Sequence, residues 1–375
     1  MSKTMIYADH AATTAMSPVA YEAMLPWLQD KYGNPSTPYS LARDPRKAVA
    51  QSREVIAAAI HADPSEIFFT SGGTEADNWA LKGTVFQHER GKGIITSAIE
   101  HHAILNSCAA LERMGYSINM LPVDHEGVVH ADTLRSALTS NTVLVSVMLA
   151  NNEIGTIEPI AELARLAHQK GVLFHTDAVQ AIGHIPVDVN VLQVDMLSAS
   201  AHKFNGPKGV GFLYVRNGVH IAPLLDGGGQ EGGMRAGTEN VAGIVGMATA
   251  LQEHMEHMAK ETKYLNELSG KLIDQLKHNG LDFRINGSSN RIPGSLSLSF
   301  NSVDGEMLLH RLDLMGTAVA TGSACDSKDA VLSHVIRAIS APPEYGHGTI
   351  RVTLGMENTA EHMERIAQQI TLILH

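Results

Sequence analysis

One lysine of this 375-residue chain stands where two apolar segments meet. Lys203 lies in the small, polar stretch 198–209, between the apolar runs 194–197 and 210–215, which predict two strands. A lysine at the end of a buried strand loses hydration, and desolvation lowers the pKa of a lysine ammonium group. Such an amine can form a Schiff base with a carbonyl cofactor. A solvated loop lysine is the alternative, and both interpretations remain open at this point.

A second candidate site follows an earlier apolar run. The segment 67–70 predicts a buried strand, and Ser71-Gly72-Gly73-Thr74-Glu75 leads from it into a helix through residues with small side chains. The free N–H groups of such a helix start, together with the helix dipole, can hold a phosphate. An ordinary helix cap explains the same residues, and the chain lacks the Gly-x-x-x-x-Gly-Lys pattern of a P-loop.

The elements that must position these residues alternate along the chain. Apolar runs at 93–97, 143–148 and 172–176 predict strands, and amphipathic patterns at 102–114 and 159–170 predict helices. Such alternation predicts a mostly parallel sheet covered by helices on both faces, and ligands collect at the carboxyl ends of its strands. The polar residues expected there are Thr74, Glu100, His101, Asn151, Asn152, Asp177, Gln180, Ser200, His202 and Lys203.

The length predicts two domains, because a single core typically stops growing near about 250–300 residues. We expect a large α/β domain over 15–255, and a smaller α+β domain made of 1–14 and 256–375. A long helical pattern over about 240–278 is expected to connect them. Strict alternation at 295–300 predicts a strand of the small domain with one face in water.

Composition excludes several classes of function. The net charge of −11 argues against broad binding to nucleic acid or anionic lipid, and no apolar run resembles a signal peptide or a membrane span. The two cysteines, Cys108 and Cys325, form no zinc or disulfide pattern, and the 20 histidines lack ligand spacing. We therefore expect a cytoplasmic protein without a built-in metal site.

Five segments together resemble one enzyme family. They are Ser71–Glu75, Asn151-Asn152-Glu153-Ile154-Gly155, His175-Thr176-Asp177-Ala178-Val179-Gln180, Ser200-Ala201-His202-Lys203 and Gly322-Ser323-Ala324-Cys325. Their order is similar to that of the cysteine desulfurases, and the resemblance spans nearly the whole chain, from Asp9 to Gly355. These are pyridoxal 5'-phosphate (PLP) enzymes of fold-type I, in the class-V aminotransferase family, so the large domain is expected to contain a mostly parallel, seven-stranded type of sheet.

The resemblance implies a role in cofactor binding for most of the polar residues. Lys203 would carry PLP as an aldimine and move protons, and Asp177 would pair with the pyridine nitrogen. His101 would stack on the ring. The remaining implied contacts are those of Gln180 and Asn152 with the ring oxygen side, of Gly73, Thr74, Ser200 and His202 with the phosphate, and of Thr238 with the phosphate of the other subunit in a homodimer.

The resemblance also implies how L-cysteine is used. Arg351 would bind the substrate carboxylate, together with Asn152, because its planar guanidinium is a bidentate donor. The Cys325 thiolate would take up the sulfur as a persulfide and release alanine. Its neighbours indicate a flexible loop, whereas Cys108, within a predicted helix, is expected to be a buried apolar residue.

Some positions depart from the family pattern and leave the sulfur acceptor open. Asp326 stands beside Cys325 where relatives have Ser or Thr, and its negative charge should raise the pKa of the thiol. Gly232 and Met356 replace arginines, and the chain ends at His375 without a longer extension. The acceptor could belong to iron–sulfur cluster assembly, tRNA thiolation, DNA sulfur modification or another carrier system.

Three functions are consistent with these residues. We expect a cytoplasmic homodimer that converts L-cysteine to L-alanine and passes the sulfur to an acceptor protein, without contact with membranes or nucleic acid. The alternatives are a selenocysteine lyase or aminotransferase of the same fold, and a PLP-binding scaffold subunit of a sulfur-transfer complex. The joint presence of Lys203, Asp177, His101 and Cys325 argues against the scaffold, which does not need all four.

Overall fold

The computed structural model describes residues 5–88, 91–322 and 332–375. Its largest sheet has seven strands in the order β2-β8-β7-β6-β5-β3-β4. Strand β8 runs antiparallel to both of its neighbours, and the other pairs are parallel. The strands are β2 (Ile67–Thr70), β3 (Gly93–Ser97), β4 (Ser117–Leu121), β5 (Thr142–Ser146), β6 (Leu173–Asp177), β7 (Met196–Ser200) and β8 (Gly211–Val215). The expected mostly parallel sheet is confirmed.

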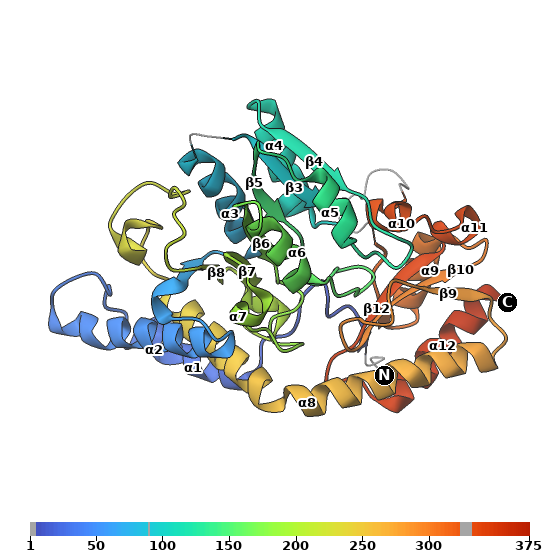
Figure 1. Ribbon diagram of the computed structural model, residues 1–375. Coiled ribbons are helices and arrows are strands. Elements are labelled where there is room, and N and C mark those ends of the chain that lie inside the picture. The colour runs from blue at the N-terminus through green and yellow to red at the C-terminus, as the bar shows by residue number, and fades with distance from the viewer. Residues whose placement is uncertain (1–4, 89–90, 323–331) are drawn as a thin grey trace.

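Helices cover both faces of this sheet (Figure 1). They are α3 (Gly73–Gln87), α4 (His102–Arg113), α5 (Ala131–Ala137), α6 (Ile160–His168) and α7 (Val189–Leu192), with α1 (Pro18–Gln29) and α2 (Arg43–Ala59) packed against the N-terminal half of α8 (Val241–His278). Short 3₁₀ turns lie at Ser40–Ala42, Pro64–Glu66, Ala201–Lys203 and Gln230–Gly233. Helix α1 begins at Pro18, where the Ser17 side chain accepts a hydrogen bond from the Ala20 N–H.

Strand β8 shows why the strands are continuous apolar runs. Phe212 and Tyr214 pack into one apolar cluster, and Leu213 and Val215 pack into another on the opposite face. Successive side chains of a strand point to opposite faces, so a sheet covered on both faces requires apolar residues at every position. All five residues of β8 are buried as a result.

A second group of elements lies at the other end of α8. It contains the antiparallel sheet β12-β10-β9 and the parallel pair β1-β11. The elements are β1 (Ile6–Tyr7), β9 (Phe283–Asn286), β10 (Ser295–Phe300), α9 (Gly305–Leu314), β11 (Thr317–Ala318), α10 (His334–Ala338), α11 (Pro343–Gly346), β12 (Thr349–Thr353) and α12 (Ala360–Leu374). Leu272 of α8, Leu298 and Ile366 share its apolar core.

Helix α8 is 38 residues long and passes from the first group of elements to the second (Figure 1). The connecting helix expected over 240–278 is therefore confirmed. The expected boundary between residues 255 and 256 falls inside this helix, and we retain the division into two domains as a proposal.

The expectation of a wet face on the strand 295–300 is wrong. All six residues of β10 are buried, because other segments cover its serine face. The Asn286 amide donates hydrogen bonds to Ser297 and Ser299, and Ser299 also bonds the Thr349 hydroxyl at 2.6 Å. Alternation of serine and apolar residues thus marks a buried face whose polar groups are satisfied internally.

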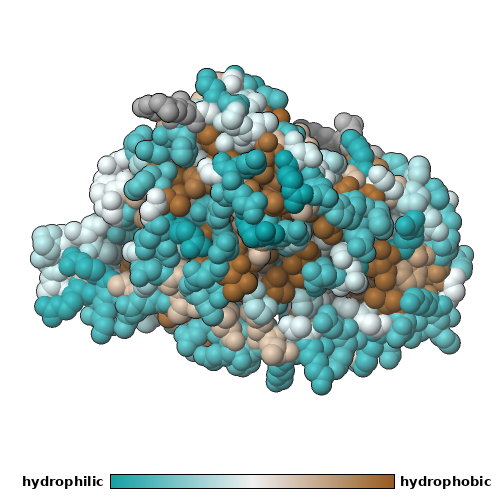
Figure 2. All heavy atoms as spheres, in the orientation of Figure 1, coloured by the Kyte–Doolittle hydropathy of each residue, from teal (hydrophilic) through white to brown (hydrophobic). Residues whose placement is uncertain are grey.

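Hydrophilic side chains cover most of the face shown in Figure 2. Within the described ranges, every helix is too short or too polar to cross a lipid bilayer.

Candidate active site

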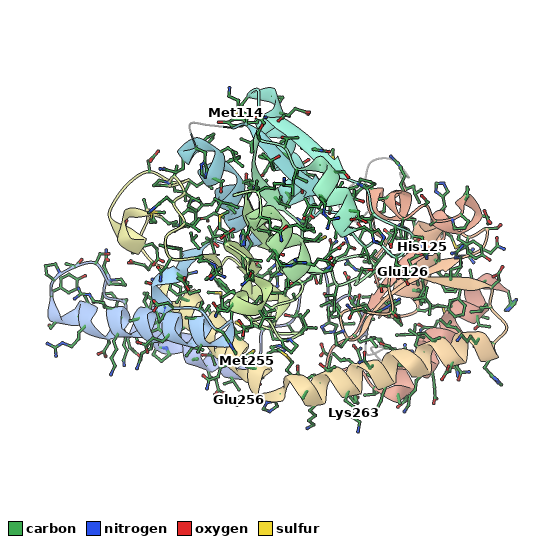
Figure 3. All side chains as sticks on the ribbon, in the orientation of Figure 1. Met114, His125, Glu126, Met255, Glu256 and Lys263 are labelled. Carbon is green, nitrogen blue, oxygen red and sulfur yellow. The ribbon has the colours of Figure 1, made fainter. Side chains whose placement is uncertain are left out.

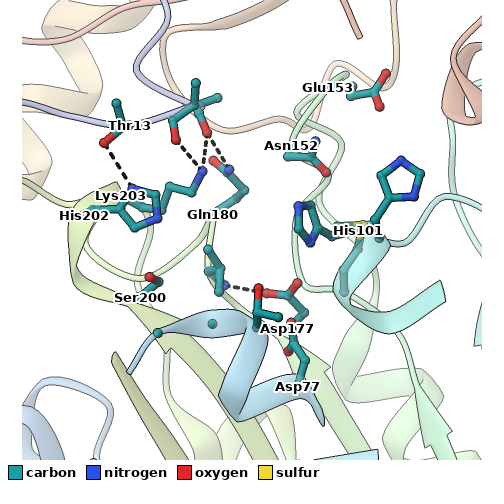
Figure 4. A pocket seen from close by; sticks show the side chains of 18 of the residues that line it. Thr13, Asp77, His101, Asn152, Glu153, Asp177, Gln180, Ser200, His202 and Lys203 are labelled. Carbon is teal, nitrogen blue, oxygen red and sulfur yellow. Dashed lines mark hydrogen bonds between the residues drawn. The ribbon is translucent and has the colours of Figure 1, made fainter. Parts of the chain in front are cut away.

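A pocket of about 610 Å³ opens at the carboxyl ends of the central strands. Ten of the residues proposed from the sequence line it, although they come from both groups of elements (Figure 4). These residues are Gly73, Thr74, His101, Asn152, Asp177, Gln180, Ser200, His202, Lys203 and Arg351.

Lys203 ends the 3₁₀ turn that follows β7. Its Nζ atom donates hydrogen bonds to the carbonyl oxygens of Ala11, at 2.6 Å, and Ala12, at 2.9 Å (Figure 4). The Gln180 amide donates to the same Ala11 oxygen at 3.0 Å. An N-terminal segment almost 200 residues away in sequence therefore forms the wall of the pocket beside the lysine.

Asp177 is the last residue of β6 and is 4% exposed. Its Oδ1 atom accepts a hydrogen bond from the Val179 N–H at 2.9 Å. Burial raises the pKa of this carboxyl to about 6, while the Val179 bond and the positive charge of Lys203 oppose the rise. A cationic group in the pocket would favour the ionised form of Asp177 further.

Two further buried acids, Asp77 and Glu100, lie close to Asp177. The sequence analysis assigns no role to Asp77. Burial and the charge of Asp177 raise the pKa of Asp77 well above its usual value. Burial raises the pKa of Glu100 to about 8, although its Oε1 accepts bonds from Ser97 and Met148. Glu100 therefore keeps its proton to a higher pH than Asp177 does. No local signal in the sequence identifies Asp77, which is one polar residue within the helix α3.

His175 lies on β6, with its Nε2 atom 3.8 Å from the Asp77 Oδ1 atom. Its Nδ1 and Nε2 atoms lie 2.9 Å from the hydroxyls of Ser146 and Ser198, respectively. Burial lowers the pKa of His175 to about 3, so the ring is neutral and adds no charge behind Asp177.

The first turn of α3 forms a cradle for an anion. Gly72 is the N-cap and has no side chain to bond the N–H groups of that turn. At Gly73, a Cβ atom would lie 2.6 Å from the Val179 Cγ2 atom, so only glycine fits without movement. Thr74 and Ser200 line the same part of the pocket. These groups match the hydrogen-bonding needs of a phosphate.

His202 lies at the edge of this cradle. Its Nδ1 atom is 3.1 Å from the Thr13 hydroxyl, and burial, with the charges of Lys203 and Lys208, lowers its pKa to about 4. A neutral ring whose Nδ1 accepts from Thr13 carries its proton on Nε2 and can donate it to a ligand.

His101 caps the N-terminus of α4, where its Nδ1 atom accepts a hydrogen bond from the Ala103 N–H at 3.1 Å. Burial and the nearby charge of Lys203 lower its pKa to about 4. The neutral ring therefore carries its proton on Nε2. His102 and His334, which the sequence does not single out, also line the pocket, and so does Glu153 of the segment 151–155.

Arg351 reaches the pocket from β12 of the second group of elements. Its guanidinium donates to the Asn152 carbonyl at 2.8 Å and to the Asp9 carboxylate at 2.7 Å. The buried Nε atom has no hydrogen-bond partner among the described residues. Arg351 thus presents an unsatisfied donor in a pocket that could admit a carboxylate.

The remaining predicted residues lie elsewhere. Thr238 is exposed, in the loop before α8, and does not line this pocket. Cys325, Asp326 and Lys328 lie outside the described residues, although Thr321 and Gly322, just before them, line the pocket. Cys108 is buried as expected, and burial raises the pKa of its thiol to about 12.

Metal ligation finds no support in the part of the chain that the structure describes. There, no group of three or more His, Cys, Asp or Glu side chains is arranged to hold a metal ion.

Comparison with known proteins identifies the family of this chain. Residues 6–366 match the family model of class-V aminotransferases. The cysteine desulfurase IscS of Dictyoglomus turgidum is 50% identical, over 99% of this chain and 96% of that protein. A solved NifS-like protein superposes with a TM-score of 0.93 at 38% identity, covering 99% of both chains. A structure described as SspA in complex with cysteine has a TM-score of 0.83 at 34% identity, covering 93% of this chain and 98% of that one. The chain therefore belongs to the class-V aminotransferase family and, within it, to the cysteine desulfurases.

Proposed function

We propose that this protein is a PLP-dependent cysteine desulfurase, which converts L-cysteine to L-alanine and transfers the sulfur through Cys325 to an acceptor protein. One observation carries the proposal. Lys203 and the carboxyl of Asp177 line the same pocket, beside the uncapped first turn of α3. An amine, an acid and an anion cradle in one pocket match the aldehyde, ring nitrogen and phosphate of PLP.

The donor set fits this cofactor. The absence of a side chain at Gly73 and the uncapped first turn of α3 suit a phosphate, with Ser200 and His202 lining the same pocket. Asp177 lines the pocket and is oriented by the Val179 N–H, so that its carboxylate could accept a hydrogen bond from a protonated ring nitrogen. When bound, PLP supplies an electron sink for the substrate Cα. Gln180 and Asn152 would contact the ring oxygen, and the neutral His101 would stack on the ring.

The side chains of this protein would do the remaining work. Lys203 would hold the cofactor and, once released from it, move protons to and from the substrate Cα. The carbonyls of Ala11 and Ala12, which now accept from Nζ, provide a resting position for the ammonium group. Arg351 would bind the substrate carboxylate through its unsatisfied Nε atom and a shared Nη atom.

Cys325 would accept the sulfur. Gly322 lines the pocket, and the three residues from there to the cysteine span at most about 10 Å when extended. The thiolate would attack the sulfur of the bound cysteine, forming the S–S bond of a persulfide while the substrate C–S bond breaks and its electrons pass to the substrate carbon. Protonation of that carbon then gives alanine.

The partners of the reaction remain proposals. We propose a homodimer in which Thr238 reaches the phosphate site of the other subunit. Its exposure and the exposed apolar side chains of Val19, Tyr21 and Leu28 on α1 support an interface between copies. The buried thiol of Cys108 suits a reducing compartment, which supports the cytoplasm as the location. The sulfur acceptor is a separate protein of unassigned pathway.

Two variants test the proposed reaction. We expect Lys203→Ala to abolish the visible absorption band of bound PLP, and Cys325→Ala to keep that band while losing alanine release from L-cysteine in thiol-free buffer. Cys108→Ala is the matched control and should retain both signals. Alanine release that persists in Cys325→Ala would rule out the persulfide route, and a product other than alanine would favour an aminotransferase. A band without turnover in the parent chain, with any acceptor, would favour a scaffold.

A further inference from the structure

The backbone turn that carries Lys203 is held from behind by a set of polar side chains. Asn205, two residues after the lysine, has a φ of 59°, in the left-handed region that asparagine tolerates better than most residues. Its backbone N–H donates to the Thr14 hydroxyl at 2.8 Å, and its carbonyl accepts from the Ser17 N–H. Its side-chain Nδ2 donates to the Ala15 carbonyl at 2.7 Å. These bonds orient the Asn205 amide so that Oδ1 points to α8.

His254 of α8 has an acceptor at each ring nitrogen. Its Nε2 atom lies 2.9 Å from the Asn205 Oδ1 atom, and its Nδ1 atom lies 3.1 Å from the Glu261 carboxylate. Although burial raises it, the hydrogen bond and the charge of His254 hold the pKa of Glu261 below its usual value, so the carboxylate is ionised and only accepts. A neutral imidazole has a single N–H, and both bonds therefore form only when His254 is an imidazolium.

His184 is a further polar residue that contacts the turn carrying Lys203. Its Nε2 atom lies 2.9 Å from the Lys203 carbonyl oxygen, and its ring packs edge-on against His254 with centroids 5.7 Å apart. Burial, followed by the charge of His254, lowers the pKa of His184 to about 4, so its one N–H points to the lysine carbonyl. A Cβ atom on the neighbouring Gly183 would lie 2.7 Å from the Phe204 Cβ atom, which shows how closely the two segments pack.

Helix α8 separates these residues from solvent. Met255, Glu256 and Lys263 lie on its outer side (Figure 3). His254, which is 8% exposed, and Glu261 lie on the side that faces the lysine turn. The same helix continues into the core shared with β10 and α12. The turn that carries Lys203 is thereby attached to the element that joins the two groups of strands.

We infer that His254, as an imidazolium paired with Glu261, is a positioning residue that holds the Lys203 turn through Asn205, while His184 holds the lysine carbonyl. The inference rests on the proposed role of Lys203 as the cofactor lysine. The other titratable groups around the pair are His257 on α8 and His10, whose charges act on Glu261 and His184, respectively. Loss of either of the two bonds of His254 would loosen the turn.

Kinetics of the PLP-loaded enzyme test the positioning role. We expect His254→Gln to lower kcat about tenfold while KM changes less than threefold, because a displaced lysine slows proton transfer but leaves Arg351 in place. Glu261→Gln removes the ionised acceptor of the His254 Nδ1 atom, and should lower kcat in the same way but by less than His254→Gln does. The control variants His278→Gln and Glu267→Gln, at exposed positions of the same helix, should have the same kcat and KM as the parent.

A direct measurement on the parent chain avoids any question of misfolded variants. In ¹⁵N-histidine NMR spectra at pH 7, both ring nitrogens of His254 should have the shifts of N–H nitrogens, with the signals assigned by their loss in His254→Gln. A neutral ring, or kcat values of His254→Gln and Glu261→Gln that equal that of the parent, would overturn the inference. The NMR result does not depend on turnover, so it remains decisive even if the protein does not desulfurate cysteine.

Discussion

The Oδ1 atom of Asp9 accepts a hydrogen bond from an Nη atom of Arg351 at 2.7 Å, across 342 positions of sequence. Both side chains are largely buried, with exposed fractions of 19% and 8%, so solvent screens the pair only in part. The proposed carboxylate-binding arginine therefore already has an anionic partner. An incoming substrate carboxylate must share the guanidinium with Asp9.

Asp9→Asn should increase the affinity for L-cysteine. The amide oxygen can still accept from Arg351, but the competing negative charge is gone, and we expect KM to fall about three- to tenfold, equivalent to ~0.7–1.4 kcal/mol. Steady-state kinetics of alanine release would measure the change. Arg351→Lys is the opposing control, for which KM should rise at least about tenfold because lysine lacks the bidentate donor. A higher KM in Asp9→Asn would mean that Asp9 serves mainly to orient the arginine.

Gly73→Ala should weaken PLP binding. The new Cβ atom would lie 2.6 Å from the Val179 Cγ2 atom, at the first turn of the proposed phosphate cradle. We expect the dissociation constant for PLP, measured by absorbance after dialysis, to rise about tenfold, with little loss of thermal stability. Val179→Ala removes the atom that clashes, so the double variant should regain part of the affinity. Equal affinities in the single and double variants would locate the phosphate elsewhere.

Glu100→Gln should change how stability depends on pH. Burial raises the pKa of Glu100 from 4.5 to about 8, so the folded state retains a proton that the unfolded state loses at lower pH. The stabilisation from this proton is present below pH 4.5 and is lost as pH rises towards 8. Glutamine mimics the protonated acid, and its oxygen can accept from Ser97 and Met148 as Glu100 does. The melting temperature of the variant, relative to the parent, should therefore increase between pH 5 and pH 8.5, and a constant difference would contradict the assignment.

His168→Gln should destabilise the protein mainly at low pH. The Asp195 carboxylate, 2.8 Å from the ring, raises the pKa of His168 above 6.5 in the folded state. The resulting stability is fully present below pH 6.5 and disappears as pH rises through the folded-state pKa. Thermal unfolding at pH 5.5 and at pH 8.5 should show a larger loss at the lower pH. The control variant His278→Gln, at an exposed position on α8, should change the melting temperature by the same amount at both pH values.

Local patterns were sufficient to predict most of the large sheet. The apolar runs at 67–70 and 93–97 match β2 and β3 as the structure has them. Polar residues directly after such runs, including Lys203 and Asp177, also meet in one pocket. Strand ends in a parallel sheet share an edge, so the order of the elements alone brings these side chains together.

Several residues of the pocket escaped prediction because nothing local identifies them. The carbonyls of Ala11 and Ala12 accept from Lys203, yet no sequence pattern links these positions. Asp77 is an ordinary polar residue in the helical pattern, and its buried position behind Asp177 depends on how α3 packs over β6 and β7. The sequence also gives no sign of the segments that cover the serine face of β10, and this face is therefore wrongly expected to lie in water.

The sequence by itself determined which segments are strands and helices, which polar residues end them, and the family to which the chain is similar. Periodicity reports that a side chain is buried or at a surface, but not which distant segment covers it. Only the tertiary structure decided that Asp9 pairs with Arg351, that His254 reaches Asn205 behind the lysine, and that three acids share one interior. Those contacts set the charges and pKa values of the site, because electrostatic energies depend on distance and burial rather than on order along the chain.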